Sequence, residues 1–191
     1  MEIKVGRVIR SSTTRFTVGC RLLRPQVPVF GALVKARAGV EIYGLIYDVR
    51  MEDDPFLRQM ATLDDLQPEY IEDQRHNRQV PIEVGVLVVG YRHNGEIYHW
   101  LPPQPPLSLD VIHACGPDEW IAFTRRFDYF CLVLENRDLP ADELLAAHLR
   151  YAAQVRGKDK DSFLLDAGRE LARLLAMDPI RLHALLGRIR P

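Results

Sequence analysis

A proline-rich segment divides this chain of 191 residues into two parts with different hydrophobic patterns. Residues 102–106 read Pro-Pro-Gln-Pro-Pro, a composition that suits neither a central strand nor the interior of a helix. Before it, apolar residues come in short β-branched runs; after it, they recur at the spacing of amphipathic helices. The pattern therefore predicts an α+β protein whose β-rich and helical parts are joined by a stiff linker over residues 102–115.

Six strand patterns precede the proline-rich segment. They cover residues 3–9, 15–23, 30–36, 40–49, 82–91 and 96–101. Gly39 separates the third from the fourth pattern, and Asn94-Gly95 separates the last two. Gly39 can adopt a positive φ, and Asn-Gly is the strongest short signal for a tight turn between antiparallel strands, so both places predict a β-hairpin.

The strand patterns favour closure of residues 1–101 into a small six-stranded antiparallel β-barrel. An open sheet of such short strands would leave unpaired edges, which closure removes. Glycines at positions 6, 31 and 44 interrupt the runs, and we expect Gly6, Gly31 and Gly44 at the corners where strands bend. A charged stretch at about 53–79 reads as a helical insertion between two of the strands.

Helix signals dominate after the linker, and residues 116–191 are expected to form a helical domain. Four combinations of capping residues, acids and proline mark helix starts, at 116–119, 138–143, 161–162 and 178–179. The apolar run at 127–134 is compatible with either a buried helix or a strand, because periodicity does not decide short runs.

The net charge and the cysteine content indicate which partners and which cellular compartment the protein is expected to have. Lys and Arg number 25 and Asp and Glu 26, so the formal net charge of -1 gives no overall basic footprint for nucleic acid. The three cysteines, Cys20, Cys115 and Cys131, are scattered and form no Cys-x-x-Cys pair, which favours a reducing compartment. Without a signal peptide or a membrane-length apolar run, we expect a soluble, cytoplasmic protein with no membrane partner.

Three stretches of the first part resemble a known barrel. The opening I-K-V-G-R-V-I-R-S-S-T-T-R-F-T-V, the block V-P-V-F-G-A-L-V and the strand I-Y-G-L-I-Y-D-V are similar to the HAS-barrel, which HerA-type DNA translocases share with ATP synthase subunits. The resemblance covers residues 1–101, and Gly6, Gly31 and Gly44 fall at the family's strand glycines. It implies packing against neighbouring subunits or docking to a partner.

The resemblance does not extend to the ATPase that follows the barrel in HerA-type translocases. No G-x-x-x-x-G-K-[ST] phosphate-binding loop occurs anywhere in the sequence. Nucleotide hydrolysis is therefore not among the expected activities.

Two further candidate sites, one for a cation and one for a nucleophilic cysteine, lack the residue spacing of known motifs. The acids Asp48 and 52–54 could bind a divalent cation, but they lack a calcium-loop pattern. Cys115 precedes a helix start, which favours a thiolate, and His113 is near it, so a hydrolase-like enzyme is a further hypothesis. Neither place matches an established motif, and we expect no catalytic residue, cofactor or metal.

The C-terminal stretch offers an alternative function. Residues 163–190 have the spacing of a helix-turn-helix unit, and four basic residues of its second helix could face a phosphate backbone. They are Arg181, His183, Arg188 and Arg190. The same spacing also fits a plain helical hairpin that completes a small bundle.

The resulting hypothesis is a non-enzymatic assembly or adaptor protein. Its barrel would dock onto a second copy or onto a larger machine, which the resemblance suggests is a HerA-type translocase and its nuclease in DNA end processing. DNA binding through residues 163–190 is the alternative.

Overall fold

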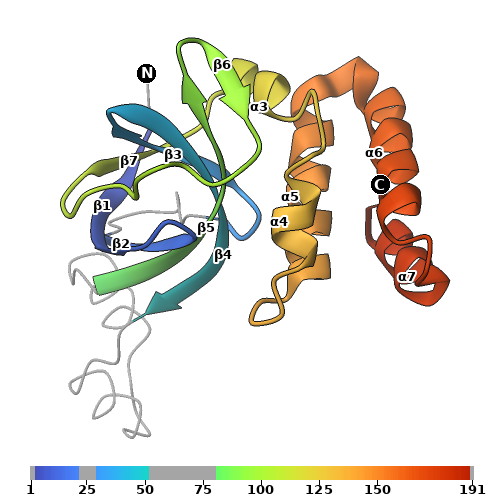
Figure 1. Cartoon of the computed structure of the whole chain (residues 1–191), viewed down its shortest axis with the longest axis horizontal. Helices are drawn as coiled ribbons and strands as arrows, with labels where there is room; N and C mark the ends of the chain where they lie inside the picture. The colour runs from blue at the N-terminus through green and yellow to red at the C-terminus, as the bar shows by residue number, and fades with distance from the viewer. Residues whose placement is uncertain (1–2, 22–28, 52–80, 190–191) are drawn as a thin grey trace, which may run out of the picture.

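Seven β-strands form one antiparallel sheet in the computed structural model, which describes residues 3–21, 29–51 and 81–189. The strands are β1 (Lys4–Ser11), β2 (Arg15–Arg21), β3 (Leu33–Ala38), β4 (Val40–Met51), β5 (Pro81–His93), β6 (Glu96–Tyr98) and β7 (Val111–Ala114). Six of them close into a barrel in the order β2-β1-β7-β3-β4-β5, because β2 also pairs with β5 (Figure 1). Helices follow, so the predicted α+β class with an N-terminal six-stranded antiparallel barrel is confirmed.

The sixth strand of the barrel is not the one that the sequence predicted. Residues 96–101 were expected to belong to the barrel, but β6 extends β5 as a hairpin beyond the closed ring. The ring is completed by β7, which pairs with β1 and β3 and comes from residues 102–115, the expected linker. A strand of four residues with one fully buried side chain, Ile112, is too short to show a periodic pattern.

Both predicted hairpins are present. β3 and β4 are joined at Gly39, and β5 and β6 are joined at Asn94-Gly95. Asn94 has φ +50° and Gly95 has φ +84°, the pair of positive angles that a tight two-residue turn between twisted strands requires. The predicted insertion at 53–79 lies outside the described residues.

Alternating side chains give the barrel two separate apolar contacts. One set fills the interior and comes from all six strands: Val8, Phe16, Val18, Val34, Ala36, Ile42, Ile46, Ile82, Val84, Val86, Val88 and Ile112. A second set on the outer surface of β3, β4 and β5 packs against the helices: Leu33, Tyr43, Leu45, Leu87 and Val89. The helical part is therefore seated directly on one side of the barrel.

The helices begin close to the predicted starts. They are α3 (Pro117–Phe123), α4 (Phe130–Leu134), α5 (Ala141–Arg156), α6 (Lys160–Leu174) and α7 (Pro179–Ile189), with a 3-10 turn at Gly157–Asp159 between α5 and α6. The ambiguous run 127–134 contains helix α4. Helix α5 lies between the barrel and the outer pair α6 and α7 (Figure 1). Among the helices of the described residues, none combines the length and apolar character needed to cross a lipid bilayer.

The three glycines expected at barrel corners have two different roles. Gly6 and Gly44 lie beside shifts in strand register, and a Cβ at either position would overlap the neighbouring strand. Gly31 lies in the turn before β3, with φ +85°, and its amide donates to the carbonyl oxygen of Ile46 at 2.8 Å. A Cβ there would lie 2.8 Å from Cβ of Ala147, so Gly31 marks the contact between barrel and α5.

Candidate docking surface

The segment between β6 and β7 carries several large apolar side chains that remain exposed. From Trp100 to Leu109 the sequence contains no charged residue. Four side chains of this segment remain exposed to solvent: Trp100 (52%), Leu101 (37%), Leu107 (68%) and Leu109 (66%). We call these four residues the 100–109 face. Exposed apolar side chains that gather in one segment are a feature of interaction sites on soluble proteins.

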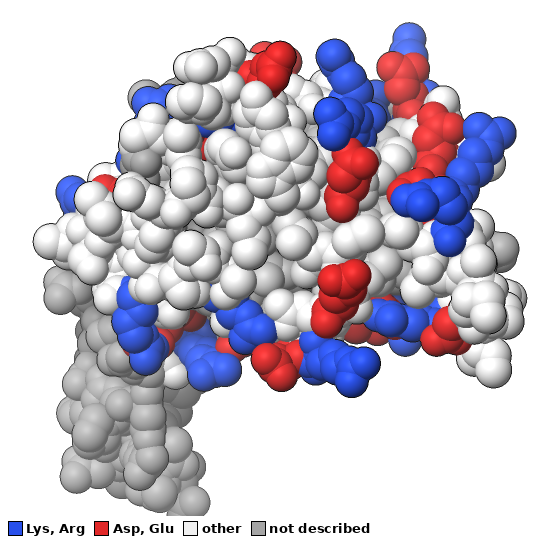
Figure 2. All heavy atoms as spheres, in the orientation of Figure 1, with Lys and Arg blue, Asp and Glu red and all other residues white. Residues whose placement is uncertain are grey.

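The prolines of this segment hold it against the barrel. Pro102 and Pro106 are buried, whereas Pro103 between them is exposed. In Figure 1 the chain leaves β6, crosses the barrel and turns back as β7 toward α3. Figure 2 shows that the barrel surface in this view is nearly free of charged side chains, while charges gather at its lower edge and over the helices. The segment expected to be a linker is thus part of the barrel surface.

The turn that presents Leu107 and Leu109 is firmly fixed. The amide of Leu107 donates to Oδ2 of Asp110 at 2.7 Å, and the amide of Leu109 donates to the carbonyl oxygen of Val8 at 2.8 Å. Nη1 of Arg7 donates to the carbonyl oxygen of Leu109, also at 2.8 Å. These bonds join the turn to β1.

Leu109 adopts a strained backbone conformation in this turn. Its φ of +73° lies in the left-handed region, which costs a residue with a Cβ roughly 1–2 kcal/mol. The side chain gains little in return within the chain, because two thirds of it remains exposed. Strain retained without internal packing is a feature of binding sites.

Aromatic side chains extend the 100–109 face onto the β5–β6 hairpin. Tyr91 and Tyr98 stack with ring centroids 5.2 Å apart, and Trp100 lies 4.9 Å from Tyr98. Nε1 of Trp100 donates to the hydroxyl oxygen of Tyr91 at 3.3 Å. These contacts fix the rotamer of the exposed Trp100 before any partner arrives, which reduces the entropy lost on binding.

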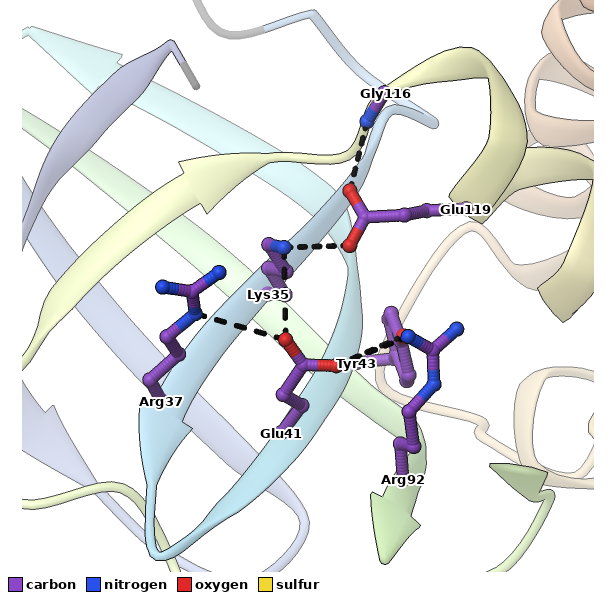
Figure 3. A network of polar contacts seen from close by, with 7 residues as sticks. All are labelled: Lys35, Arg37, Glu41, Tyr43, Arg92, Gly116 and Glu119. Atoms are coloured by element: carbon purple, nitrogen blue, oxygen red, sulfur yellow. Dashed lines mark hydrogen bonds and ion pairs between the residues drawn. The ribbon is translucent and has the colours of Figure 1, made fainter. Parts of the chain in front are cut away.

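A partly buried ionic network links the end of β5 to the first helix that follows the barrel (Figure 3). Lys35 is only 3% exposed, and its Nζ lies 2.5 Å from Oε1 of Glu119 and 3.6 Å from Oε1 of Glu41. Nη1 of Arg92, near the end of β5, lies 3.3 Å from Oε2 of Glu41. Glu119 also accepts the amide of Gly116 at 2.9 Å, which caps α3. The network links β3, β4 and β5 to the first turn of α3.

The cysteine hypothesis is not favoured by the environment of the thiol. Cys115 is buried, and burial raises the pKa of its thiol well above the usual value, so the thiol stays protonated. A protonated thiol is a poor nucleophile. His113 lies on β7 directly opposite Lys35 of β3.

The candidate cation site at Asp48 and residues 52–54 lies mostly outside the described residues. Asp48 accepts from Nε of Arg50 at 2.5 Å, and residues 52–54 are among those not described. Within residues 3–21, 29–51 and 81–189, no three His, Cys, Asp or Glu side chains come together in a way that could hold a metal ion.

The candidate nucleic-acid contacts on α7 point largely toward α5. Nε and Nη2 of Arg181 donate to Asp142 at 2.7–3.0 Å, and Nε of Arg188 donates to Oε1 of Glu143 at 2.5 Å. His183 is exposed, and Arg190 lies outside the described residues. The two arginines therefore already form ion pairs with carboxylates.

Sequence reasoning missed the 100–109 face. The signal was present as the charge-free run between Trp100 and Leu109, but the prolines favoured its interpretation as a linker. Comparison with protein-family models and with curated proteins found no match to this chain.

Proposed function

We propose that this chain is a non-enzymatic assembly or adaptor protein whose β-barrel docks onto a larger protein machine through the 100–109 face. The observation that carries the proposal is the fixed turn that holds Leu107 and Leu109 in solvent, with Leu109 in a strained conformation. The resemblance to the HAS-barrel suggests a HerA-type DNA translocase with its nuclease as the machine.

The chemistry of the face defines the partner surface. The one Trp and three Leu of the face suit an apolar protein surface, because charged groups opposite these side chains would lose their hydration without gaining partners. Tryptophan is one of the residue types enriched at the energetic centre of an interface. The rotamer of Trp100 is already held by its contacts with Tyr91 and Tyr98.

The effect of disrupting the face can be estimated. Covering the exposed parts of Leu107 and Leu109 contributes roughly 2 kcal/mol to binding, which corresponds to about a 30-fold change in Kd. Aspartate at both positions also introduces charges that the apolar partner surface cannot pair, so the loss should be at least this large.

The test uses the full chain and a purified HerA-type translocase from the same genome, with Kd measured by interferometry. The combined variant Leu107→Asp with Leu109→Asp should weaken binding about 30-fold or more. The matched control is Met177→Asp with Ile180→Asp, because these two residues are exposed and apolar but lie in the α6–α7 turn and the first turn of α7.

Two results would count against the proposal. Absence of binding by the unmodified chain would remove the translocase as the partner. Equal binding by the unmodified chain and the Leu107 and Leu109 variant would remove the 100–109 face. Thermal melting of each variant checks that the barrel remains folded.

A further inference from the structure

The outer surface of α6 and α7 contains a second apolar feature, far from the 100–109 face. A groove of about 520 Å³ runs between the two helices. Its apolar lining consists of Leu164, Leu165, Gly168, Ala172, Leu186 and Ile189. Leu165 is 57% exposed, although it lies in the middle of α6. Figure 1 places α6 and α7 on the side of α5 that faces away from the barrel.

Charged residues border this groove in a symmetric arrangement about Leu165. Asp161 lies four residues before Leu165 and Arg169 four residues after it, and both line the groove. Residues four apart lie on the same helix face, so the row reads acid, leucine, base over about 12 Å. An antiparallel copy of this row has the order base, leucine, acid.

We infer that α6 pairs with α6 of a second copy of this chain, antiparallel, about a two-fold axis at Leu165. A two-fold contact places the same surface on both sides. A residue that lies a given number of positions before Leu165 in one copy therefore meets the residue that lies the same number of positions after Leu165 in the other copy. Asp161 of each copy then meets Arg169 of the other, and the two Leu165 side chains meet at the axis. Gly168 lies opposite Ser162, and these small residues allow the helices to approach closely.

The present contacts of Arg169 do not oppose this pairing. Nη1 of Arg169 lies 3.0 Å from Oδ1 of Asp166 in the same helix, and both side chains are more than half exposed. An exposed pair at this spacing contributes little to stability, so Arg169 can turn to a partner at small cost. The contact is small, and we expect a dimer with a Kd on the order of 10 µM.

The dimer is tested by sedimentation velocity of the full chain between about 1 and 200 µM, a range that brackets that Kd. Leu165→Asp should raise Kd at least 30-fold, because two like charges would meet at the axis. Asp161→Arg and Arg169→Asp should each raise Kd about tenfold, since each creates two like-charge contacts. The combined variant Asp161→Arg with Arg169→Asp should return Kd to near its original value.

A crosslink provides a second measurement of the same geometry. Leu165→Cys places a thiol at the axis and should form a disulfide-linked dimer under mild oxidation. Ser162→Cys is the matched control, because its own symmetry mate is offset along the helix by six residues, about 9 Å. The control should crosslink much more slowly.

The inference is overturned by a chain that stays monomeric at the highest concentration. A dimer that survives Leu165→Asp, or one that the combined charge swap fails to restore, would also overturn it. These variants leave the 100–109 face unchanged, so translocase binding and dimer formation can succeed or fail independently.

Discussion

Lowering the pH should destabilise this protein through one histidine at the contact between barrel and helices. His148 is fully buried in α5, where its ring stacks on Trp120 with centroids 5.0 Å apart. Its Nδ1 lies 3.2 Å from the carbonyl oxygen of Gly31, and its Nε2 lies 3.0 Å from the hydroxyl of Tyr129. A neutral ring satisfies both contacts, because Nδ1–H donates to the carbonyl and Nε2 accepts the hydroxyl proton.

The size of the effect follows from the shifted pKa. Burial, which the Gly31 carbonyl only partly offsets, lowers the pKa of His148 to about 3. In the unfolded chain the pKa of His148 is about 6.5. Between that pH and about 3, the unfolded state therefore binds a proton that the folded state does not bind. The stabilisation is complete above pH 6.5 and is lost as the pH falls toward 3, by about 1.4 kcal/mol per unit. At pH 4.5 the loss reaches about 2.7 kcal/mol.

Urea unfolding at pH 7.5 and 4.5 measures this loss. In His148→Gln, whose amide can still donate and accept, the decrease in the free energy of unfolding between the two pH values should be smaller by about 2.7 kcal/mol. His183→Gln is the control, because His183 is exposed on α7. Burial also lowers the pKa of His99, so some acid sensitivity remains in His148→Gln. An unchanged acid sensitivity in His148→Gln would refute the reasoning.

Two further substitutions separate docking from folding. Leu109→Gly removes the Cβ that is strained at φ +73° and should raise Tm by about 2–4 °C in thermal melting, while weakening partner binding. Leu107→Gly, whose φ is not positive, should give no such rise, and equal shifts would contradict the strain argument. Arg181→Ala should lower stability by about 1–2 kcal/mol through its lost pairing with Asp142, and neither this variant nor the unmodified chain should show salt-dependent DNA binding in a gel shift. Binding by the unmodified chain that Arg181→Ala removes would instead favour the DNA alternative.

Local signals were sufficient for most of the barrel and insufficient for its closure. Gly39 and Asn94-Gly95 identify their hairpins because turn geometry depends on a few adjacent residues. β7 depends instead on pairing with β1 and β3, which lie about 100 and 80 residues earlier in the chain. The sequence of β7, Val-Ile-His-Ala, has no adjacent segment with which it forms a hairpin. Its place between β1 and β3 is therefore evident only in the assembled barrel.

The candidate surfaces show the same limit. The run from Trp100 to Leu109 is visibly uncharged in the sequence, but whether it is a linker or a surface depends on the burial of Pro102 and Pro106 against the barrel. The basic residues of α7 fit a DNA-reading helix by spacing alone. Their pairing with acids of α5 depends on the angle at which the two helices cross, which spacing does not determine.

The shared core between barrel and helices gives the two proposed contacts a defined relation. Tyr43 and Leu45 of the barrel pack in one cluster with Leu144 and Leu145 of α5, and the Lys35 network adds an ionic link at α3. The barrel and α6 should therefore move as one body. A dimer through α6 then holds two 100–109 faces at a fixed separation, and a machine with repeated subunits can engage both. The second contact forms at the high effective concentration of a tethered site, so weak individual docking still gives stable recruitment.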